Sequence, residues 1–480
     1  MVDFKLCSDY YTKLSEDFYY RINPEPAVKG DLVLFNDKLA KNLGMDLNIK
    51  NNIGIFTGDF IDPSWNPIAE AYSGHQFGYY TRLGDGRAVL LGEWKDKDSN
   101  LWDIQLKGSG KTPYSRSGDG LATLASMLRE YIISFAMQSL NIRSSGSLAL
   151  ATNGKEVFRQ KIEKGAVLTR TISSHIRIGT FEYAFEIGGK YMLKEIADYS
   201  ISRHYPSLKD DENKYLLFIE NVIDRQAKLI SLWMSKGFIH GVMNTDNMTI
   251  SGEGIDYGPC AFMDYFNFDE VFSSIDSMGR YRYKNQPMIA QWNLARFAEL
   301  FIDLIPGDDS ITELTKIVKN FMKIYKKYYL REMAAKIGIE YIDNDDINLI
   351  DELLNIMNEN SLDFTNLFYN FTNYDFDEIL KNDERFNKFI NLWENRIKKE
   401  NKTKDEIILL MKSNNPVIIP RNHMVETAIY EAVENNNIKF TKDFLKYLNS
   451  PYNYSTEIPN KFKEAMDIEM KKGYKTYCGT

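Results

Sequence analysis

The segment from His240 to Asn247, followed by Asp256-Tyr257-Gly258, constrains this chain more than any other feature. Asn247 and Asp256 carry side-chain oxygens, which are the ligands that Mg²⁺ or Mn²⁺ takes when it bridges nucleotide phosphates. In phosphotransfer loops of this layout, an aspartate five positions before the asparagine accepts the proton of the attacking hydroxyl. That position is Val242, which cannot accept a proton. The loop therefore keeps metal ligands without the usual base, and Asp246 is the carboxylate within it that could replace the base.

The same layout predicts the overall architecture. Protein kinases use a His-x-Asp-x-x-x-x-Asn loop and an Asp-Phe-Gly segment in this order. A chain of 480 residues also exceeds the size of a single core, so at least two lobes are expected. We therefore predict an α+β, two-lobed, protein-kinase-like fold. Residues 1–160 would form a mixed strand and helix N-lobe, and residues 161–480 a large helical C-lobe with a C-terminal helical extension.

Local sequence patterns predict strands in the first part of the chain and helices in the second part. Arg87–Trp94 and Leu101–Lys107 are rich in strand formers and flank a polar turn, which predicts a hairpin. Apolar residues at helical spacing predict a helix over Leu121–Leu140. A second amphipathic helix is expected over Asp211–Lys236, with Gly237 ending it, and Pro287 should open a third.

Composition excludes several classes of function. The 59 basic and 67 acidic residues give a net charge of -8, so neither nucleic acid nor an anionic membrane is an expected partner. No apolar run is long enough to span a membrane. The three cysteines, Cys7, Cys260 and Cys478, fit no zinc motif and no disulfide scaffold. A reducing cytoplasm, in a bacterium given the heavy use of Asn, Lys and Ile, is the expected location, and a monomer the expected state.

Lys107 and Glu130 form the next candidate pair. Lys107 ends the second hairpin strand, where kinases place the lysine that contacts ATP phosphates, and Glu130 lies in the following helix. A lysine followed by a glutamate is more often a solvated surface pair. Their positions on the elements that the kinase plan requires favour an ion pair that orients Lys107 at a phosphate.

Glycine-rich segments offer further phosphate contacts. In Leu83–Arg87, Gly84 and Gly86 would let the backbone approach phosphate oxygens and Arg87 would add a guanidinium, although Asp-Gly is also a common turn. Gly108–Thr112 resembles a P-loop but has Gln105 where the first glycine belongs, and Pro113 follows it, so we reject that interpretation. Asp119 and Gly120 could bind an anion at the start of the next helix, or simply form its entry.

Arg170 and Arg177 lie in a stretch, residues 166–180, that contains no acidic residue. Guanidinium groups without carboxylate partners suit phosphate, whereas ordinary exposed arginines are the alternative. We expect His175 between them, and His240 in the loop, to be structural.

These motifs and several others resemble selenoprotein O, the YdiU-type family of pseudokinases, over nearly the whole chain. The matching runs are Ser73–Gly78, Leu83–Arg87, Gln105–Gly110, Thr112–Gly120, His240–Asn247, Asp256–Pro259, Gln291–Arg296 and Arg421–Glu426.

The resemblance implies a nucleotidyltransferase that binds ATP in an inverted pose and transfers AMP to Ser, Thr or Tyr hydroxyls of proteins. It implies that Asp246 accepts the proton, that Asn247 and Asp256 bind Mg²⁺ or Mn²⁺, and that Glu130 pairs with Lys107. A buried γ-phosphate would also explain the additional arginines. The nucleotide-binding residues carried over by motif are Gly84, Gly86, Arg87, Lys107, Asp119, Gly120, Arg170, Arg177 and Asp256.

The resemblance also bears on the C-terminus. Cys478 stands where eukaryotic relatives carry selenocysteine, which family members can pair with a cysteine of the activation segment as a redox switch. Here that segment offers Cys260, whereas Phe272-Ser273-Ser274 has none. A redox role for Cys478 is therefore a hypothesis beside that of an unpaired thiol.

Three alternatives to AMP transfer remain open at this point. A catalytically inactive nucleotide-binding scaffold would bind ATP without transferring either phosphate. A small-molecule phosphotransferase would transfer the γ-phosphate, which Val242 disfavours. A nucleotidyltransferase that uses UTP would share the same site.

Overall fold

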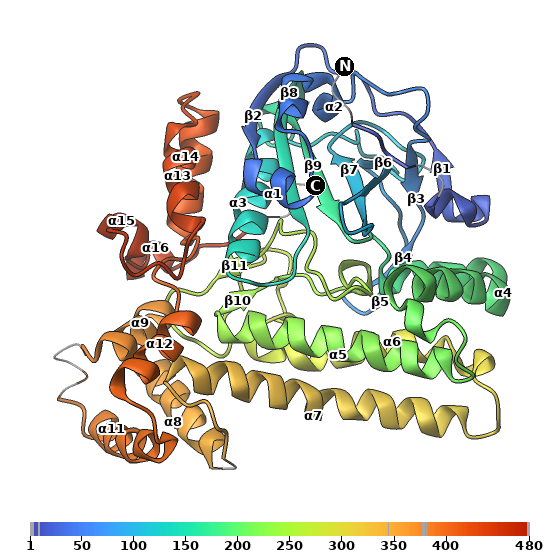
Figure 1. Cartoon of the computed structure of the whole chain (residues 1–480). Helices are drawn as coiled ribbons and strands as arrows, with labels where there is room; N and C mark the ends of the chain where they lie inside the picture. The colour runs from blue at the N-terminus through green and yellow to red at the C-terminus, as the bar shows by residue number, and fades with distance from the viewer. Residues whose placement is uncertain (1–3, 8–9, 344, 377–379, 381, 478–480) are drawn as a thin grey trace.

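A seven-stranded sheet forms most of the N-terminal part of the chain, and helices form most of the remainder (Figure 1). The structure is a computed structural model, and it describes residues 4–7, 10–343, 345–376, 380 and 382–477. The sheet lies above helices α5, α6 and α7, and loops fill the space between the lower edge of the sheet and these helices (Figure 1). The expectation of a strand-rich N-terminal region and a helical C-terminal part is confirmed.

The large sheet has the strand order β1-β3-β6-β7-β9-β8-β2, and its recorded pairings are antiparallel. Two further pairs, β4–β5 and β10–β11, stand apart from it. The strands are β1 Tyr19–Arg21, β2 Asp31–Phe35, β3 Ile68–Glu70, β4 Ser73–Gln76, β5 Tyr79–Arg82, β6 Ala88–Lys95, β7 Leu101–Lys107, β8 Gly146–Phe158, β9 Ile162–Ile172, β10 Phe238–Ile239 and β11 Ala261–Phe262.

The predicted hairpin is β6–β7, in which Ala88 pairs with Lys107 and Lys95 with Leu101. A second long hairpin, β8–β9, lies beside it. The expected boundary near residue 160 falls within the turn of this second hairpin. Strand β9 belongs to the sheet, and the sheet therefore continues to Ile172.

Both faces of the sheet are covered. Neighbouring residues of a strand point to opposite faces, and Leu90 and Leu91 of β6 accordingly enter two different hydrophobic clusters. One cluster contains Leu128 of helix α3, and the other contains Phe56 of helix α2. Because helices cover both faces, the central strands are held rigidly and can position the charged residues at their ends.

The α-helices are α1 Asp37–Asn42, α2 Ile53–Thr57, α3 Leu124–Ser139, α4 Ile178–His204, α5 Lys214–Ser235, α6 Gln286–Glu299, α7 Ser310–Lys336, α8 Asp346–Glu359, α9 Phe364–Asn373, α11 Glu384–Ile397, α12 Lys404–Asn414, α13 Asn422–Val433, α14 Lys439–Leu448, α15 Asn460–Lys463 and α16 Ile468–Lys471.

Three of these helices were predicted from sequence. Helix α3 begins at Leu124, later than expected, because the side chain of Thr123 accepts a hydrogen bond from the Ser126 amide and caps the helix. Helix α5 ends at Ser235, and Gly237 follows with φ +68°, as expected of a helix C-terminus. Helix α6 carries Pro287 in its first turn.

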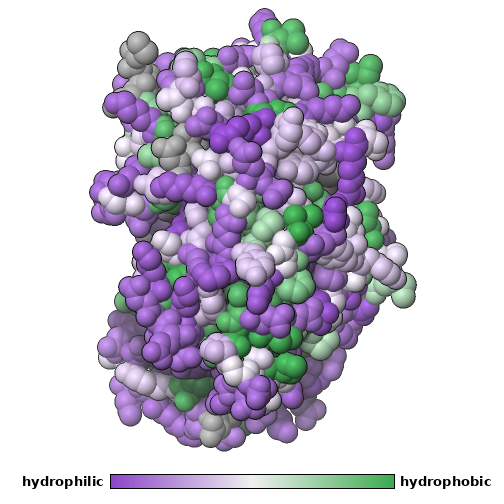
Figure 2. All heavy atoms as spheres, turned by 90° about the vertical axis from the view of Figure 1, so that its right-hand side faces the viewer, coloured by the Kyte–Doolittle hydropathy of each residue, from purple (hydrophilic) through white to green (hydrophobic). Residues whose placement is uncertain are grey.

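The C-terminal helices return to the N-terminal part. Helices α13 and α14 lie beside α3 (Figure 1), and the hydroxyl of Tyr452 donates a hydrogen bond to the carbonyl of Leu140 at 3.2 Å. Among the helices of the described residues, none is both long and apolar enough to cross a bilayer. Figure 2 shows a largely hydrophilic face on which apolar residues gather toward the lower half, at the level of the long helices.

Candidate active site

A cavity of about 530 Å³ lies where the sheet meets the loops above the long helices. Its wall is formed by residues that are far apart in sequence and belong to the turn before β6, the end of β7, helix α3, strand β9 and the loop around 246. The residues predicted to bind the nucleotide or the metal, to accept the proton or to form the ion pair all line this cavity, namely Gly84, Gly86, Arg87, Lys107, Asp119, Gly120, Glu130, Arg170, Arg177, Asp246, Asn247 and Asp256.

Three cations converge on the carboxylate of Asp256. Lys107 Nζ lies 2.6 Å from Oδ1, Arg170 Nη1 lies 2.7 Å from the same oxygen, and Arg177 Nη1 lies 3.3 Å from Oδ2. Although burial favours the neutral acid, these cations hold the pKa of Asp256 well below its usual range. Asp256 also has φ +61°, a conformation that non-glycine residues adopt mainly where the surroundings or the function require it.

Glu130 completes the cluster from helix α3. Its Oε2 lies 2.7 Å from Lys107 Nζ, and its Oε1 lies 3.3 Å from Arg170 Nη1. Both partners of the predicted ion pair are buried, so this is not a solvated surface contact. Gln105, on the strand that carries Lys107, accepts hydrogen bonds from Nε and Nη2 of Arg170 at 3.1 and 2.5 Å. Lys107 and Arg170 are thereby fixed on adjacent strands with their charges directed into the cavity.

Asp246 has a different environment from Asp256. Burial raises the pKa of Asp246 to about 7, Arg177 counteracts that rise, and the neighbouring Asp256 and Glu182 add to it. The Oδ1 atom of Asp246 is buried and has no hydrogen-bond partner among the described residues. Arg177 donates instead to the backbone carbonyl of Asp246, at 3.0 Å. A buried carboxylate with an unsatisfied oxygen and a pKa near neutrality has the properties of a general base.

The loop that carries Asp246 is held by its own side chains. Residues Thr245–Asn247 form the short helix η5. Thr245 donates to Oε2 of Glu182 at 2.8 Å, and Asn247 Nδ2 donates to the carbonyl of Val242 at 2.9 Å. Only the Oδ1 atom of the Asn247 carboxamide can bind a cation, and the hydrogen bond from Nδ2 fixes the orientation of the group. His240 is buried and bonds through Nε2 to the carbonyl of Ile255 at 2.8 Å, which supports the predicted structural role.

The glycine-rich turn before β6 approaches the loop around Tyr114 closely. A Cβ atom on Gly84, which has φ +133°, would lie 2.4 Å from the ring of Tyr114. Between the glycines, Asp85 is buried, and its carboxylate accepts a hydrogen bond from Gln105 Nε2 at 3.0 Å. Burial raises the pKa of Asp85 to about 6, against the opposing effect of Arg177. The turn is therefore an integral part of the charged network.

Sequence reasoning missed two residues of this network, Asp85 and Tyr72. The Arg177 guanidinium lies 4.3 Å from the centre of the Tyr72 ring and 3.9 Å from Asp85 Oδ1. The sequence indicated contacts from Gly84, Gly86 and Arg87 but no role for the Asp85 side chain. The one available signal was its position between two glycines of a candidate phosphate loop.

Asp119 and Gly120 lie at another part of the cavity wall. The Asp119 carboxylate binds Arg159 at 2.7 and 3.0 Å and accepts from the Leu121 amide at 2.9 Å. The structure agrees that Gly108–Thr112 is not a P-loop. The backbone amide of Lys111 donates a hydrogen bond to Glu25 at 2.9 Å, and no helix follows this segment directly.

His175 is structural, as predicted, because it is buried with Nδ1 2.9 Å from Asp103 Oδ2. Burial lowers the pKa of His175 to about 4, against the opposing effect of Asp103. Cys260 is a buried free thiol whose pKa is raised by burial. Cys478 lies outside the described residues.

Similarity to known proteins agrees with this geometry. A family model described as "Protein adenylyltransferase SelO" matches residues 6–449. The chain belongs to the SelO family. It is 50% identical over 478 residues to a Clostridium perfringens (strain SM101) protein named "Protein nucleotidyltransferase YdiU", covering 98% of this chain and 96% of the relative. Proteins of the same name from Halalkalibacterium halodurans and Shouchella clausii are 46% and 45% identical over 98% of this chain, covering 96% and 98% of their own lengths. The resemblance seen in the sequence motifs is thus confirmed, and the family is one of nucleotidyltransferases that modify proteins.

Proposed function

We propose that this chain transfers AMP from ATP to Ser, Thr or Tyr hydroxyls of proteins, using a two-lobed, kinase-like arrangement of residues 1–160 and 161–480. The observation that carries the proposal is one cavity in which Lys107, Arg170 and Arg177 converge beside a buried, unsatisfied Asp246. Such a site combines binding groups for a polyphosphate with a base for an alcohol. The family of the chain is consistent with this chemistry.

The cations account for nucleotide binding. Lys107, Arg170 and Arg177 are each within ion-pairing distance of Asp256, and they share Asp256, Glu130 and the buried Asp85 as their nearest carboxylates. Phosphate oxygens can take part in the same network, since guanidinium groups bind phosphate through paired hydrogen bonds. We further assign Gly84, Gly86, Arg87, Asp119 and Gly120, which line the same cavity, to the nucleotide.

A divalent cation is compatible with the residues present. Asn247 Oδ1 and the Asp256 carboxylate are hard oxygen ligands, and the unsatisfied Oδ1 of Asp246 lies on the same cavity wall. Among the described residues there is no cluster of three or more His, Cys, Asp or Glu that could hold a metal, so part of the coordination would have to come from phosphate and water. Mg²⁺ characteristically binds in this way, through one or two protein ligands. When bound, Mg²⁺ or Mn²⁺ would neutralise charge on the phosphates.

The reaction then requires one proton acceptor. The acceptor hydroxyl oxygen forms a bond to the α-phosphorus of ATP, and the bond from that phosphorus to the oxygen that bridges to the β-phosphate breaks. AMP becomes esterified to the protein, pyrophosphate leaves, and the hydroxyl proton passes to the Asp246 carboxylate. A pKa of about 7 suits a base that works near neutral pH. Positioning and charge neutralisation by Lys107, Arg170 and Arg177 would supply most of the rate.

An inverted nucleotide reconciles this chemistry with the missing kinase base. Val242 occupies the position where kinases deprotonate the acceptor of the γ-phosphate. If the α-phosphorus lies near Asp246, the γ-phosphate must lie elsewhere, and buried arginines would compensate its charge. Arg170 and Arg177 are both buried and line the cavity.

The deciding experiment is incubation of the protein, an acceptor protein and a divalent metal with ATP labelled at either the α- or the γ-phosphate. AMP transfer labels the acceptor from α-labelled ATP alone. Label from γ-labelled ATP would establish phosphotransfer instead, and no label from either, with ATP still bound, would establish a scaffold. A parallel incubation with α-labelled UTP shows whether the protein uses ATP or UTP as the nucleotide donor. Asp246→Asn should abolish labelling while it preserves ATP binding.

A further inference from the structure

A second charged cavity lies behind the nucleotide site and takes no part in the proposed reaction. It has a volume of about 570 Å³, which lies within the range of small-molecule sites. Its wall includes Lys95 at the end of β6, Arg143 after α3, Arg203 at the end of α4 and Arg225 of α5. We call it the rear cavity.

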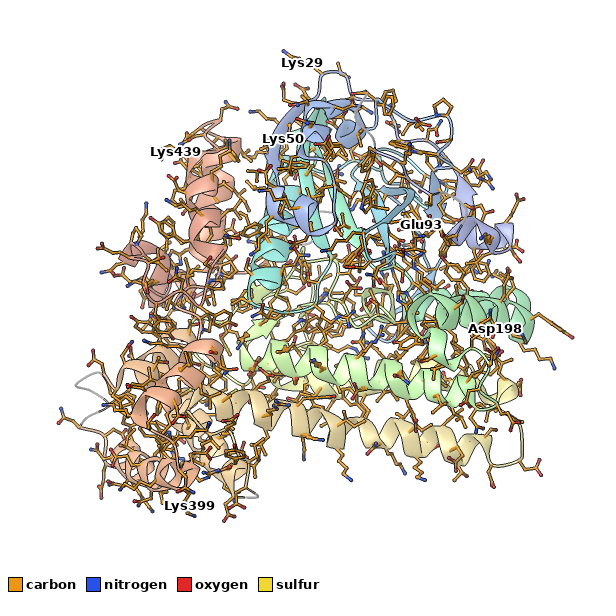
Figure 3. All side chains as sticks on the ribbon, viewed as in Figure 1. Lys29, Lys50, Glu93, Asp198, Lys399 and Lys439 are labelled. Atoms are coloured by element: carbon orange, nitrogen blue, oxygen red, sulfur yellow. The ribbon has the colours of Figure 1, made fainter. Side chains whose placement is uncertain are left out.

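The rear cavity is located between the sheet and helix α4. Figure 3 labels Glu93 on the sheet side and Asp198 on α4 below it. Arg203, near the C-terminal end of α4, bridges this gap, because its guanidinium lies 2.5 Å from Asp103 Oδ1 and 3.6 Å from Glu93 Oε1. The cavity is therefore bounded by fixed elements on both sides.

Positive charge in the rear cavity exceeds negative charge. Arg203 is matched by Asp103 and Glu93, as described above, but within the described part of the chain no ion pair neutralises Lys95, Arg143 or Arg225. The carboxylate among the lining residues is Glu253, which accepts a hydrogen bond from Ser173. Four cations and one carboxylate thus line the rear cavity, and the two acids that pair with Arg203 are not among the lining residues.

Arg225 is fixed in place at the wall of the rear cavity. Arg225 is held by stacking at 4.2 Å over the ring of Tyr205 and by a hydrogen bond from Nη2 to the carbonyl of His204 at 3.2 Å. Burial lowers the pKa of His204 well below its usual range, and Arg203, Arg225 and Arg143 lower it further. The imidazole is consequently neutral and does not add to the charge of the rear cavity, which His204 also lines.

We propose that the rear cavity binds a small anion that carries a phosphate group. Guanidinium pairs favour phosphate over other anions because their planar donors match its oxygens. The hydroxyls of Ser99 and Ser202 also line the cavity and can donate to phosphate oxygens.

The rear cavity is connected through the backbone to the segment that carries Asp256. The Gly254 amide donates to the carbonyl of Arg143 at 3.0 Å, and the Ser145 amide donates to the carbonyl of Gly254 at 2.9 Å. Ser173 lies between Arg170 and Arg177 and bonds Glu253, which is three residues before Asp256. Arg143 and the segment that carries Asp256 are therefore neighbours, joined by backbone hydrogen bonds.

The test is calorimetric titration of the full chain with inorganic phosphate. Arg143→Ala should weaken phosphate binding about tenfold, since it removes a charge-assisted hydrogen bond, and Arg143→Lys should restore part of it. The side chain of Arg143 is exposed and its backbone contact to Gly254 survives the substitution, so the fold should be preserved, with only a small loss of stability because Arg143 lowers the pKa of the buried Glu253. Arg331→Ala removes an exposed arginine of α7 outside the cavity and should titrate as the wild type.

Crystals soaked in tungstate locate the anion independently. The proposal requires an anomalous peak between Arg143 and Arg225. It is overturned if tungstate occupies the catalytic cavity alone, or if Arg143→Ala binds phosphate as tightly as the wild type. A peak that persists in Arg143→Ala crystals would identify an adventitious ion only, and would overturn the proposal as well.

Discussion

Replacing Asp246 by asparagine should make the protein inactive and, at neutral pH, more stable. The folded pKa of Asp246 is about 7, against 3.8 for a free aspartate. A carboxyl whose pKa is raised on folding binds its proton more tightly in the native state, so its ionisation destabilises the fold as pH rises from about 4 to 7. The cost reaches about 4 kcal/mol at pH 8 and about 1.7 kcal/mol at pH 5. Asparagine keeps the shape and removes the charge.

The assay is urea unfolding of the nucleotide-free protein at both pH values. Asp246→Asn should raise the free energy of unfolding by up to about 4 kcal/mol at pH 8 and by distinctly less at pH 5. Asp98→Asn, an identical change at an exposed turn, should alter it by less than about 0.5 kcal/mol at either pH. The reasoning is refuted if Asp246→Asn is no more stable than the wild type at pH 8, or if its effect is the same at both pH values.

Three further predictions follow from the same cluster. The rate of AMP transfer at limiting substrate should rise with pH and level off above an apparent pKa near 7, because Asp246 must be ionised to accept a proton; a flat profile would exclude it as the base. Lys107→Ala should raise the KM for ATP, which steady-state kinetics measures. It should also destabilise the fold by about 3 kcal/mol, because Glu130 and Asp256 lose a buried partner, and chemical denaturation measures this loss. Gly74→Ala places a Cβ atom 2.1 Å from Asp246 Oδ1, so kcat should fall at least tenfold with an unchanged circular dichroism spectrum; unaltered kcat would contradict the position of Asp246.

The sequence predicted the elements that have strong local signals. The β6–β7 hairpin follows from two runs of strand formers around a polar turn, and α5 from its apolar stripe and terminal Gly237. The start of α3 was predicted at Leu121 and lies at Leu124, because Leu121 fits the helical spacing of apolar residues and the capping role of the Thr123 side chain is not evident from the sequence. That β9 belongs to the sheet was not predicted, because its pairing with β7 joins residues that are far apart along the chain.

The candidate site was predicted more completely than the fold around it. Spaced motifs indicated Lys107, Glu130 and Asp256, and all three meet in one buried cluster. What sequence could not supply is the environment of each carboxylate. Asp246 and Asp256 are both buried aspartates, yet one has a raised and the other a lowered pKa, because only Asp256 faces three cations. That difference depends on contacts between strands, helices and loops that are distant along the chain.

The central claim is that Asp246 promotes attack on the α-phosphorus of ATP. It is tested most directly by intact mass spectrometry of an acceptor protein after incubation with ATP, a divalent cation and either wild-type protein or Asp246→Asn. We predict a mass increase of one adenylate group with the wild type and none with the variant. An increase of a single phosphate, or an adenylate added equally well by Asp246→Asn, would contradict the account.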